Sequence, residues 1–234
     1  MQTEIRLTED GSHTLHVPEI DECYHSTHGA VQESTHIFIH AGLKEFCGSN
    51  LCEGNELRIL EVGFGTGLNA YLTLLEAERL KIRIRYTTLE LYPLSMEDAM
   101  RLNYPEILYS GKDLFTKMHF SSWNEIHEIT ADFSLHKVQA DFTACELQGL
   151  YDVIYFDAFS PEKQPEMWLE DGFRKIYEHA GNGAVIITYC AKGVVRRAMQ
   201  SAGFVMERLP GPPGKREILR GKRTVSCSEP NRIA

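Results

Sequence analysis

A glycine-rich turn carries most of the chemical information in this sequence. Residues 61–69 read EVGFGTGLN, with Gly63, Gly65 and Gly67 at alternate positions. Because glycine lacks a Cβ atom, such a turn can bend sharply, approach a ligand closely and expose the N–H groups of the helix that follows. The GxGxG spacing favours S-adenosylmethionine (SAM) over NAD or FAD, whose fingerprint is GxGxxG. A turn with only a structural role is the alternative.

Three carboxylates stand where predicted strands end. Glu90 ends the second strand and should accept hydrogen bonds from both ribose hydroxyls, and Leu91 after it can pack near the base. Asp141 follows the third strand, where the adenine would lie. Glu61 ends the first strand and would orient the turn or the amino acid part of SAM. For Glu90, a surface carboxylate at a strand end is the alternative.

Asp157 follows the fourth predicted strand and opens the segment DAFSP. In open α/β sheets this is the end of the strand at which ligands bind. A carboxylate there can orient an amine and take up its proton, so Asp157 is the predicted catalytic residue and also a cofactor contact. Phe159 and Pro161 would form an apolar wall that excludes water. A helix-capping or turn role for Asp157 is the alternative.

Other candidates rest on residue type and position. Asn69 ends the glycine turn, and a polar loop near the amino terminus contains Tyr24, Glu33 and Ser34, which could fold over the cofactor or the acceptor. Hydrogen bonding within that loop is the alternative. The remaining predicted substrate contacts are basic and suit phosphates: Lys163, Lys192, Arg196, Lys215 and Arg216.

The charge is unevenly distributed. The formal net charge is −9, which argues against binding nucleic acid by overall attraction. Residues 190–234 nevertheless contain ten Lys and Arg against three Glu, a net of +7, so the remainder carries −16. This basic end could follow a phosphate backbone, or it could be a solvated face.

Alternating strand and helix patterns from Leu57 onward predict a Rossmann-like α/β fold with a mostly parallel sheet. Residues 203–209 and 216–219 should add an antiparallel strand pair, residues 4–7 and 14–17 an amino-terminal β-hairpin, and residues 103–135 a partly helical insertion. The predicted strands are 57–63, 84–90, 136–140, 151–157 and 184–190, and the predicted helices are 35–46, 67–79, 95–102, 165–180 and 193–202.

Length and composition limit the remaining possibilities. The 234 residues suit one α/β core domain over 51–221, an extension over 1–50 and a polar tail over 222–234. No apolar run reaches the roughly 18 residues of a membrane helix, and the start lacks a secretion signal, so we expect a cytoplasmic protein. Six cysteines without CxxC and ten histidines without HExxH predict no metal site.

Several longer segments resemble a known family: ILEVGFGTGLNA, TTLELYPL, YDVIYFDAFSPEKQPEMW, TYCAKGVVRRAMQSAGF and LPGPPGKREIL. They are similar to the methyltransferase of 5-methylaminomethyl-2-thiouridine biosynthesis in tRNA, over roughly residues 20–220. The resemblance implies a class I SAM-dependent methyltransferase that methylates the amine of 5-aminomethyl-2-thiouridine at the wobble position. It also implies cofactor or catalytic roles for the matching residues Glu61, Gly63, Gly65, Gly67, Glu90, Asp141 and Asp157.

One departure from that family concerns length. In bifunctional relatives a flavin-dependent oxidoreductase domain follows, whereas this sequence ends at Ala234, so we expect no flavin domain and methylation alone. The expected partner is the tRNA anticodon stem-loop, bound weakly and in a salt-sensitive way through the basic carboxyl-terminal end. The alternatives are a class I transferase acting on a small amine, as aminopropyltransferases do, a nucleotide-binding oxidoreductase, and a non-catalytic RNA-binding module.

Overall fold

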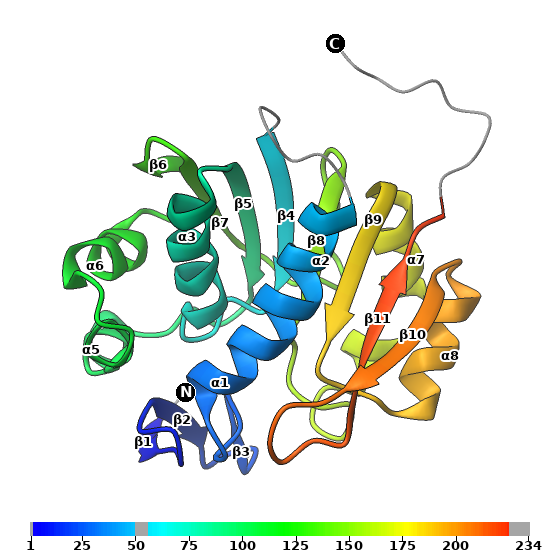
Figure 1. Cartoon of the computed structure of the whole chain (residues 1–234). Coiled ribbons are helices and arrows are strands. Elements are labelled where there is room, and N and C mark those ends of the chain that lie inside the picture. The colour runs from blue at the N-terminus through cyan, green and yellow to red at the C-terminus, as the bar shows by residue number, and fades with distance from the viewer. Residues whose placement is uncertain (1, 50–55, 225–234) are drawn as a thin grey trace.

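The computed structural model describes residues 2–49 and 56–224 and is built around one large sheet (Figure 1). The strands of this sheet are β4 (Glu56–Val62), β5 (Arg83–Glu90), β6 (Ile126–Thr130), β7 (Phe133–Gln139), β8 (Tyr151–Phe156), β9 (Ala180–Thr188), β10 (Val205–Pro210) and β11 (Glu217–Lys222). They lie in the order β10-β11-β9-β8-β4-β5-β7-β6. The five strands from β9 to β7 are parallel, while β11, β10 and β6 run antiparallel to their neighbours. The predicted mostly parallel sheet with an antiparallel carboxyl-terminal pair is confirmed.

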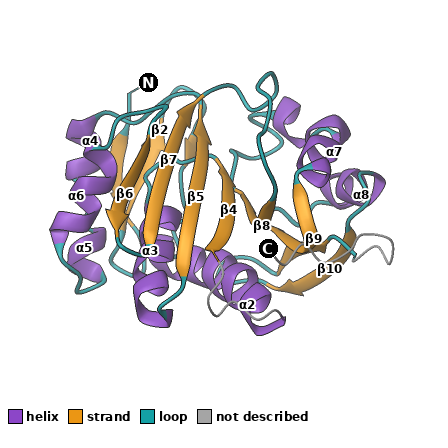
Figure 2. Cartoon of the chain, turned by 90° about the horizontal axis from the view of Figure 1, so that it is seen from above, coloured by secondary structure: helices purple, strands orange, loops and turns teal. Residues whose placement is uncertain are grey.

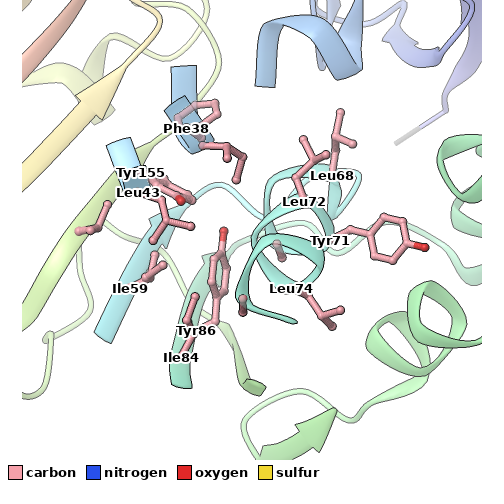
Figure 3. Close-up of a cluster of buried hydrophobic side chains, with 14 of the residues drawn as sticks. Phe38, Leu43, Ile59, Leu68, Tyr71, Leu72, Leu74, Ile84, Tyr86 and Tyr155 are labelled. Atoms are coloured by element: carbon pink, nitrogen blue, oxygen red, sulfur yellow. The ribbon is translucent and has the colours of Figure 1, made fainter. Parts of the chain in front are cut away.

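Helices cover both faces of this sheet (Figure 2). After the amino-terminal segment they are α3 (Leu68–Leu80), α4 (Met96–Met100), α5 (Tyr104–Ile107), α6 (Lys112–Phe120), the 3-10 helix η2 (Pro165–Trp168), α7 (Glu170–Glu178) and α8 (Gly193–Ser201). Alternate residues of the central strands enter two different cores, because successive side chains of a strand point to opposite faces. Tyr155 packs with Phe38 and Tyr86 in the core of Figure 3, whereas Ile154 and Phe156 pack under α7 and α8.

The amino-terminal segment forms a small sheet and one long helical run. Strands β1 (Glu4–Leu7), β2 (His13–Val17) and β3 (Glu22–Cys23) form the sheet, which contains the predicted hairpin and a third strand that was not predicted. The helical run comprises α1 (Ala30–Ser34), the π-helix η1 (Thr35–Lys44) and α2 (Glu45–Ser49). Phe38 of η1 lies against Tyr155 of β8, with ring centroids 5.1 Å apart, so this segment shares the core of the large sheet.

Two predicted elements differ from the observed ones. The insertion at 103–135 holds α5 and α6 but also β6, which pairs antiparallel with β7 at the edge of the sheet. The helix predicted over 165–180 is broken at Leu169, whose extended backbone (ψ 155°) separates η2 from α7. Residues 225–234, most of the predicted polar tail, lie outside the described residues, and Lys222 belongs to β11. In the part of the chain that the structure describes, no helix has the length and apolarity to span a membrane.

The strand order reverses between β4 and β8. From β4 the chain adds β5 and then β7 on one side, and it later returns to place β8 and β9 on the other side. Ligands of open α/β sheets bind in the crevice beyond the carboxyl ends of the strands at such a reversal. Gly63 follows β4 and Asp157 follows β8, so the two strongest predicted site elements meet there, with Asp157 N donating to Val62 O at 2.9 Å.

Candidate functional site

A cavity of about 300 Å³ opens at this reversal. The segments that follow β4, β5, β7, β8 and β9 line it, together with the amino-terminal segment and the loop between β10 and β11. Its walls include these predicted site residues: Tyr24, Glu33, Gly63, Gly65, Glu90, Leu91, Asp141, Asp157, Phe159 and Lys215. The fold therefore gathers ten predicted residues from six separate segments into one space.

The glycine turn is shaped by close contacts that exclude side chains. Gly63 has φ +97°, and a Cβ atom there would lie 2.6 Å from the carbonyl oxygen of Asp157. At Gly65, with φ +50°, a Cβ atom would lie 2.8 Å from the ring of Tyr24. Gly67 follows and is the N-cap of α3 in the left-handed conformation. The backbone can therefore approach a ligand in the cavity only with glycine at these positions.

Glu90 is fixed by backbone donors at the rim of the turn. Its Oε2 accepts from Gly65 N at 3.0 Å and its Oε1 accepts from Tyr92 N at 2.9 Å. Loss of water raises the pKa of this carboxyl group, and the backbone hydrogen bonds act in the opposite direction. Both oxygens have further lone pairs, so the group can accept hydrogen bonds from a pair of hydroxyls in the cavity.

Replacing Glu90 with alanine should weaken binding of S-adenosylhomocysteine by about 10- to 100-fold, because hydrogen bonds to a charged group contribute about 1.5–3 kcal/mol each. Isothermal titration calorimetry measures this affinity. Glu97→Ala is the matched control, since Glu97 is an exposed carboxylate in the next helix, α4. Equal affinities for the two variants would contradict the assignment of Glu90 to the ribose.

Asp141 lies two residues beyond β7 and faces the cavity beside Phe142. Its Oδ1 accepts from Thr143 N at 2.8 Å and from Thr143 Oγ1 at 2.7 Å. This local turn fixes the carboxylate at the same end of the cavity as Leu91. The arrangement suits a polar contact at the edge of a base whose faces meet apolar side chains.

Asp157 lies beside the glycine turn, because β8 and β4 are neighbours in the sheet. Its Oδ2 accepts from Asn69 Nδ2, on the first turn of α3, at 2.8 Å. Burial raises the pKa of this carboxyl group to about 7, with a further increase from Glu33, while Asn69 and Lys215 oppose the change. A carboxylate with a pKa near neutrality is suited to proton transfer at physiological pH.

Glu61 lies below the cavity and does not line it. The residue is fully buried, and its Oε2 accepts from Thr88 Oγ1 of β5 at 2.8 Å. Burial raises the pKa of this carboxyl group well above its usual range, and the charge of Asp157 adds to the effect. Glu61 can therefore affect a ligand only indirectly, by positioning β4 and the glycine turn that follows it.

The amino-terminal segment closes one side of the cavity. The ring of Tyr24 meets that of Phe159 edge-on, with centroids 5.0 Å apart. Glu33 of α1 accepts from Ser26 N at 2.7 Å and lies 3.1 Å from Lys215 Nζ. Ser34 is fully buried and is absent from the described residues that line the cavity.

Five other predicted substrate contacts lie outside the described lining of the cavity. They are Pro161, which was expected in the apolar wall, and the basic residues Lys163, Lys192, Arg196 and Arg216. Lys192 forms an ion pair with Glu162, and Arg196 donates to Gln200 at 2.7 Å. Several other basic side chains of the carboxyl-terminal end are also paired, among them Arg208 with Glu217, Arg220 with Glu207 and Lys222 with Glu45. These carboxylates reduce the positive potential that was expected there.

Among the lining residues that were not predicted, Tyr189 and Glu22 make hydrogen bonds to the segment after β8. Tyr189 follows β9, and its hydroxyl donates to Ala158 O at 2.9 Å. Glu22 of β3 accepts from Ser160 N and Ser160 Oγ, both at 3.0 Å, and so ties the amino-terminal sheet to the segment after Asp157. Among the described residues, no group of three or more His, Cys, Asp or Glu side chains could hold a metal ion.

Comparison with known proteins shows what this chain is similar to. Residues 111–224 match the family model described as S-adenosyl-L-methionine-dependent methyltransferase. The chain is 31% identical over 222 residues to the tRNA 5-methylaminomethyl-2-thiouridine biosynthesis bifunctional protein MnmC of Leptospira borgpetersenii serovar Hardjo-bovis, an alignment that covers 89% of this chain and 33% of the relative. The chain thus spans about a third of the length of the curated relatives it matches.

Solved structures agree with the sequence matches. MnmC2 from Aquifex aeolicus superposes with a TM-score of 0.73 at 26% identity, covering 97% of this chain and 73% of that one. Spermidine synthase from Thermotoga maritima shares the fold, with a TM-score of 0.59 at 12% identity and the same coverage. The resemblance seen in the sequence is confirmed. Over residues 111–224 the chain is similar to S-adenosyl-L-methionine-dependent methyltransferases, and over most of its length it is similar to the MnmC proteins.

Proposed function

We propose that this protein transfers a methyl group from SAM to the amine of 5-aminomethyl-2-thiouridine at the wobble position of tRNA. The observation that carries the proposal is a half-buried carboxylate, Asp157, that lies beside a glycine turn and lines the same cavity. The similarity to MnmC proteins supports the choice of substrate, because their name refers to the biosynthesis of 5-methylaminomethyl-2-thiouridine in tRNA, which would be the methylated product.

The residues of the cavity fit SAM. Gly63 and Gly65 line the cavity and can border the amino acid part, Glu90 can accept from the ribose hydroxyls, and Asp141 with Leu91 can hold the base. When bound, SAM supplies a methyl group made reactive by its sulfonium charge. The protein then has to present a nucleophile in line with that methyl group and exclude water.

Asp157 would handle the proton of the acceptor amine. An alkyl amine is mostly protonated at neutral pH and has no lone pair for attack in that form. In its ionised state, Asp157 can accept a hydrogen bond from the amine and take up its proton, while the hydrogen bond from Asn69 fixes the carboxylate. The rings of Tyr24 and Phe159 flank this end of the cavity and limit access of water.

A transfer assay with defined acceptors tests the proposed function. Purified protein is incubated with SAM and tRNA that contains 5-aminomethyl-2-thiouridine, and the nucleosides are analysed by mass spectrometry. We expect one methyl group on the wobble nucleoside, none on tRNA with an unmodified wobble uridine, and none on putrescine. Methylation of the unmodified tRNA, or activity only on the small amine, would contradict the proposal.

Contact with the anticodon stem-loop should be weak and sensitive to salt. The chain has a net charge of −9, and many cations of its carboxyl-terminal end are already paired with carboxylates. Phosphate contacts by Lys163, Lys192, Arg196 and Arg216 would supply the attraction that remains. These four residues stay predicted contacts.

A further inference from the structure

An ion pair in the wall of the cavity joins helix α1 to the loop between β10 and β11. Lys215 Nζ lies 3.1 Å from Glu33 Oε1, and the two side chains are 28% and 9% exposed. Glu33 lies on α1, whereas Lys215 lies in the loop between β10 and β11. Both residues line the cavity that contains Asp157. An ion pair this far from water interacts more strongly with nearby charges than a surface pair does.

Neighbouring groups hold both partners in place. The Nζ atom of Lys215 lies 4.8 Å from the centroid of the Tyr189 ring, and Lys215 N donates to Pro212 O at 2.9 Å. The second oxygen of Glu33 accepts from Ser26 N at 2.7 Å. The hydroxyl of Tyr189 in turn donates to Ala158 O, on the residue after Asp157. The pair is therefore part of the wall around Asp157.

Charged, titratable and polar groups act on Asp157 from several elements. They are Glu33 of α1, Lys215 of the β10–β11 loop, Asn69 of α3, Glu61 of β4, Tyr86 of β5 and Tyr189 after β9. The charge of Glu33 raises the pKa of Asp157 and the charge of Lys215 lowers it. With the pair intact, these two effects oppose each other.

We propose that Lys215 is a positioning residue that neutralises Glu33, so that Asp157 can be negatively charged when it receives the acceptor amine. This inference rests on the proposed function. It gives the ion pair the task of controlling the charge of Asp157, which differs from binding phosphate or cofactor. Without Lys215, a second carboxylate would stand unpaired beside Asp157, and like charges at one site favour the protonated form.

The test is the pH dependence of single-turnover methyl transfer, measured from pH 5 to pH 9 on four variants. Lys215→Met should move the midpoint of the rising limb to higher pH by about 1, because Glu33 is left uncompensated. Glu33→Gln should move it to lower pH, because Lys215 then acts alone. The double variant should return close to the wild-type midpoint, and Lys215→Arg should keep it.

A second ion pair provides the matched control. Arg85 of β5 and Glu56 of β4 lie 3.2 Å apart at the amino ends of their strands, at the far end of the sheet from the cavity. Arg85→Met and Glu56→Gln make the same changes of charge, and their midpoints should equal that of the wild type. Circular dichroism verifies that each variant is folded.

The outcomes separate this inference from the proposed function. If wild-type protein does not methylate the amine-containing tRNA, the proposed function fails. If the wild type is active but Lys215→Met and Glu33→Gln move the midpoint in the same direction, or not at all, the inference is wrong. Glu33→Gln keeps the size of the side chain. If Lys215→Met fails to fold, a midpoint of Glu33→Gln that does not move to lower pH is enough to contradict the inference.

Discussion

Asp157→Asn lowers the rate of methyl transfer to the amine by a factor of about 10² to 10⁴, the usual contribution of a general base. Asparagine keeps the shape of aspartate but cannot take up a proton at neutral pH. Binding of S-adenosylhomocysteine should change by less than about tenfold, because the glycine turn and Glu90 are untouched. Single-turnover kinetics and calorimetry measure the two quantities.

The rate of methyl transfer should also depend on pH, in a direction set by the protonation of Asp157. Burial raises the pKa of Asp157 to about 7, so below that pH the carboxyl group is mostly protonated and cannot accept the amine proton. Wild-type activity should therefore fall as the pH drops through about 7, and the residual activity of Asp157→Asn should lack this limb. Normal turnover by Asp157→Asn would show that the proton leaves by another route.

Gly63→Ala should abolish measurable binding of S-adenosylhomocysteine. An L-residue in the left-handed region costs about 1–2 kcal/mol, and here the new Cβ atom would also lie 2.6 Å from the backbone oxygen of Asp157. That oxygen belongs to Asp157, whose N–H is hydrogen-bonded to Val62 O, so it cannot shift without disturbing the end of β4. To relieve this contact, the glycine turn and the segment after β8 must move apart, which displaces both the expected cofactor contacts and Asp157. Calorimetry and thermal unfolding measure the losses.

Gly149→Ala is the control for backbone strain alone. Gly149 has φ +77°, similar to Gly63, but a Cβ atom there would meet nothing within 4 Å. This variant should lose about 1 kcal/mol of stability and retain its affinity for S-adenosylhomocysteine. If Gly63→Ala binds as tightly as Gly149→Ala, the close contact between the turn and Asp157 is not needed for the site.

The sequence predicts the central sheet well because its strands are buried on both faces. Residues such as Val153, Ile154 and Tyr155 form continuous apolar runs, which are typical of parallel strands between layers of helices. The edge strand β6 was missed because Ile126 is 59% exposed and its neighbours are polar, so the run IHEIT has little apolar signal. The break at Leu169 was missed because the flanking residues continue a helical pattern.

The site was predictable where chemistry and spacing coincide, as in the glycine turn and at Asp157. Contacts between distant segments were not predictable, because they depend on how the amino-terminal segment folds back. Lys215 was expected to contact phosphate, yet it lies against Glu33 in the cavity. Tyr189 and Glu22 were not predicted to line the cavity, because their places there depend on how β9 and the amino-terminal sheet pack around it.

A crystal structure with S-adenosylhomocysteine tests the central claim most directly. We expect the ribose hydroxyls on Glu90, the amino acid part at the turn formed by Gly63 and Gly65, and the sulfur facing Asp157. A ligand bound outside this turn, or a sulfur directed away from Asp157, would contradict the account.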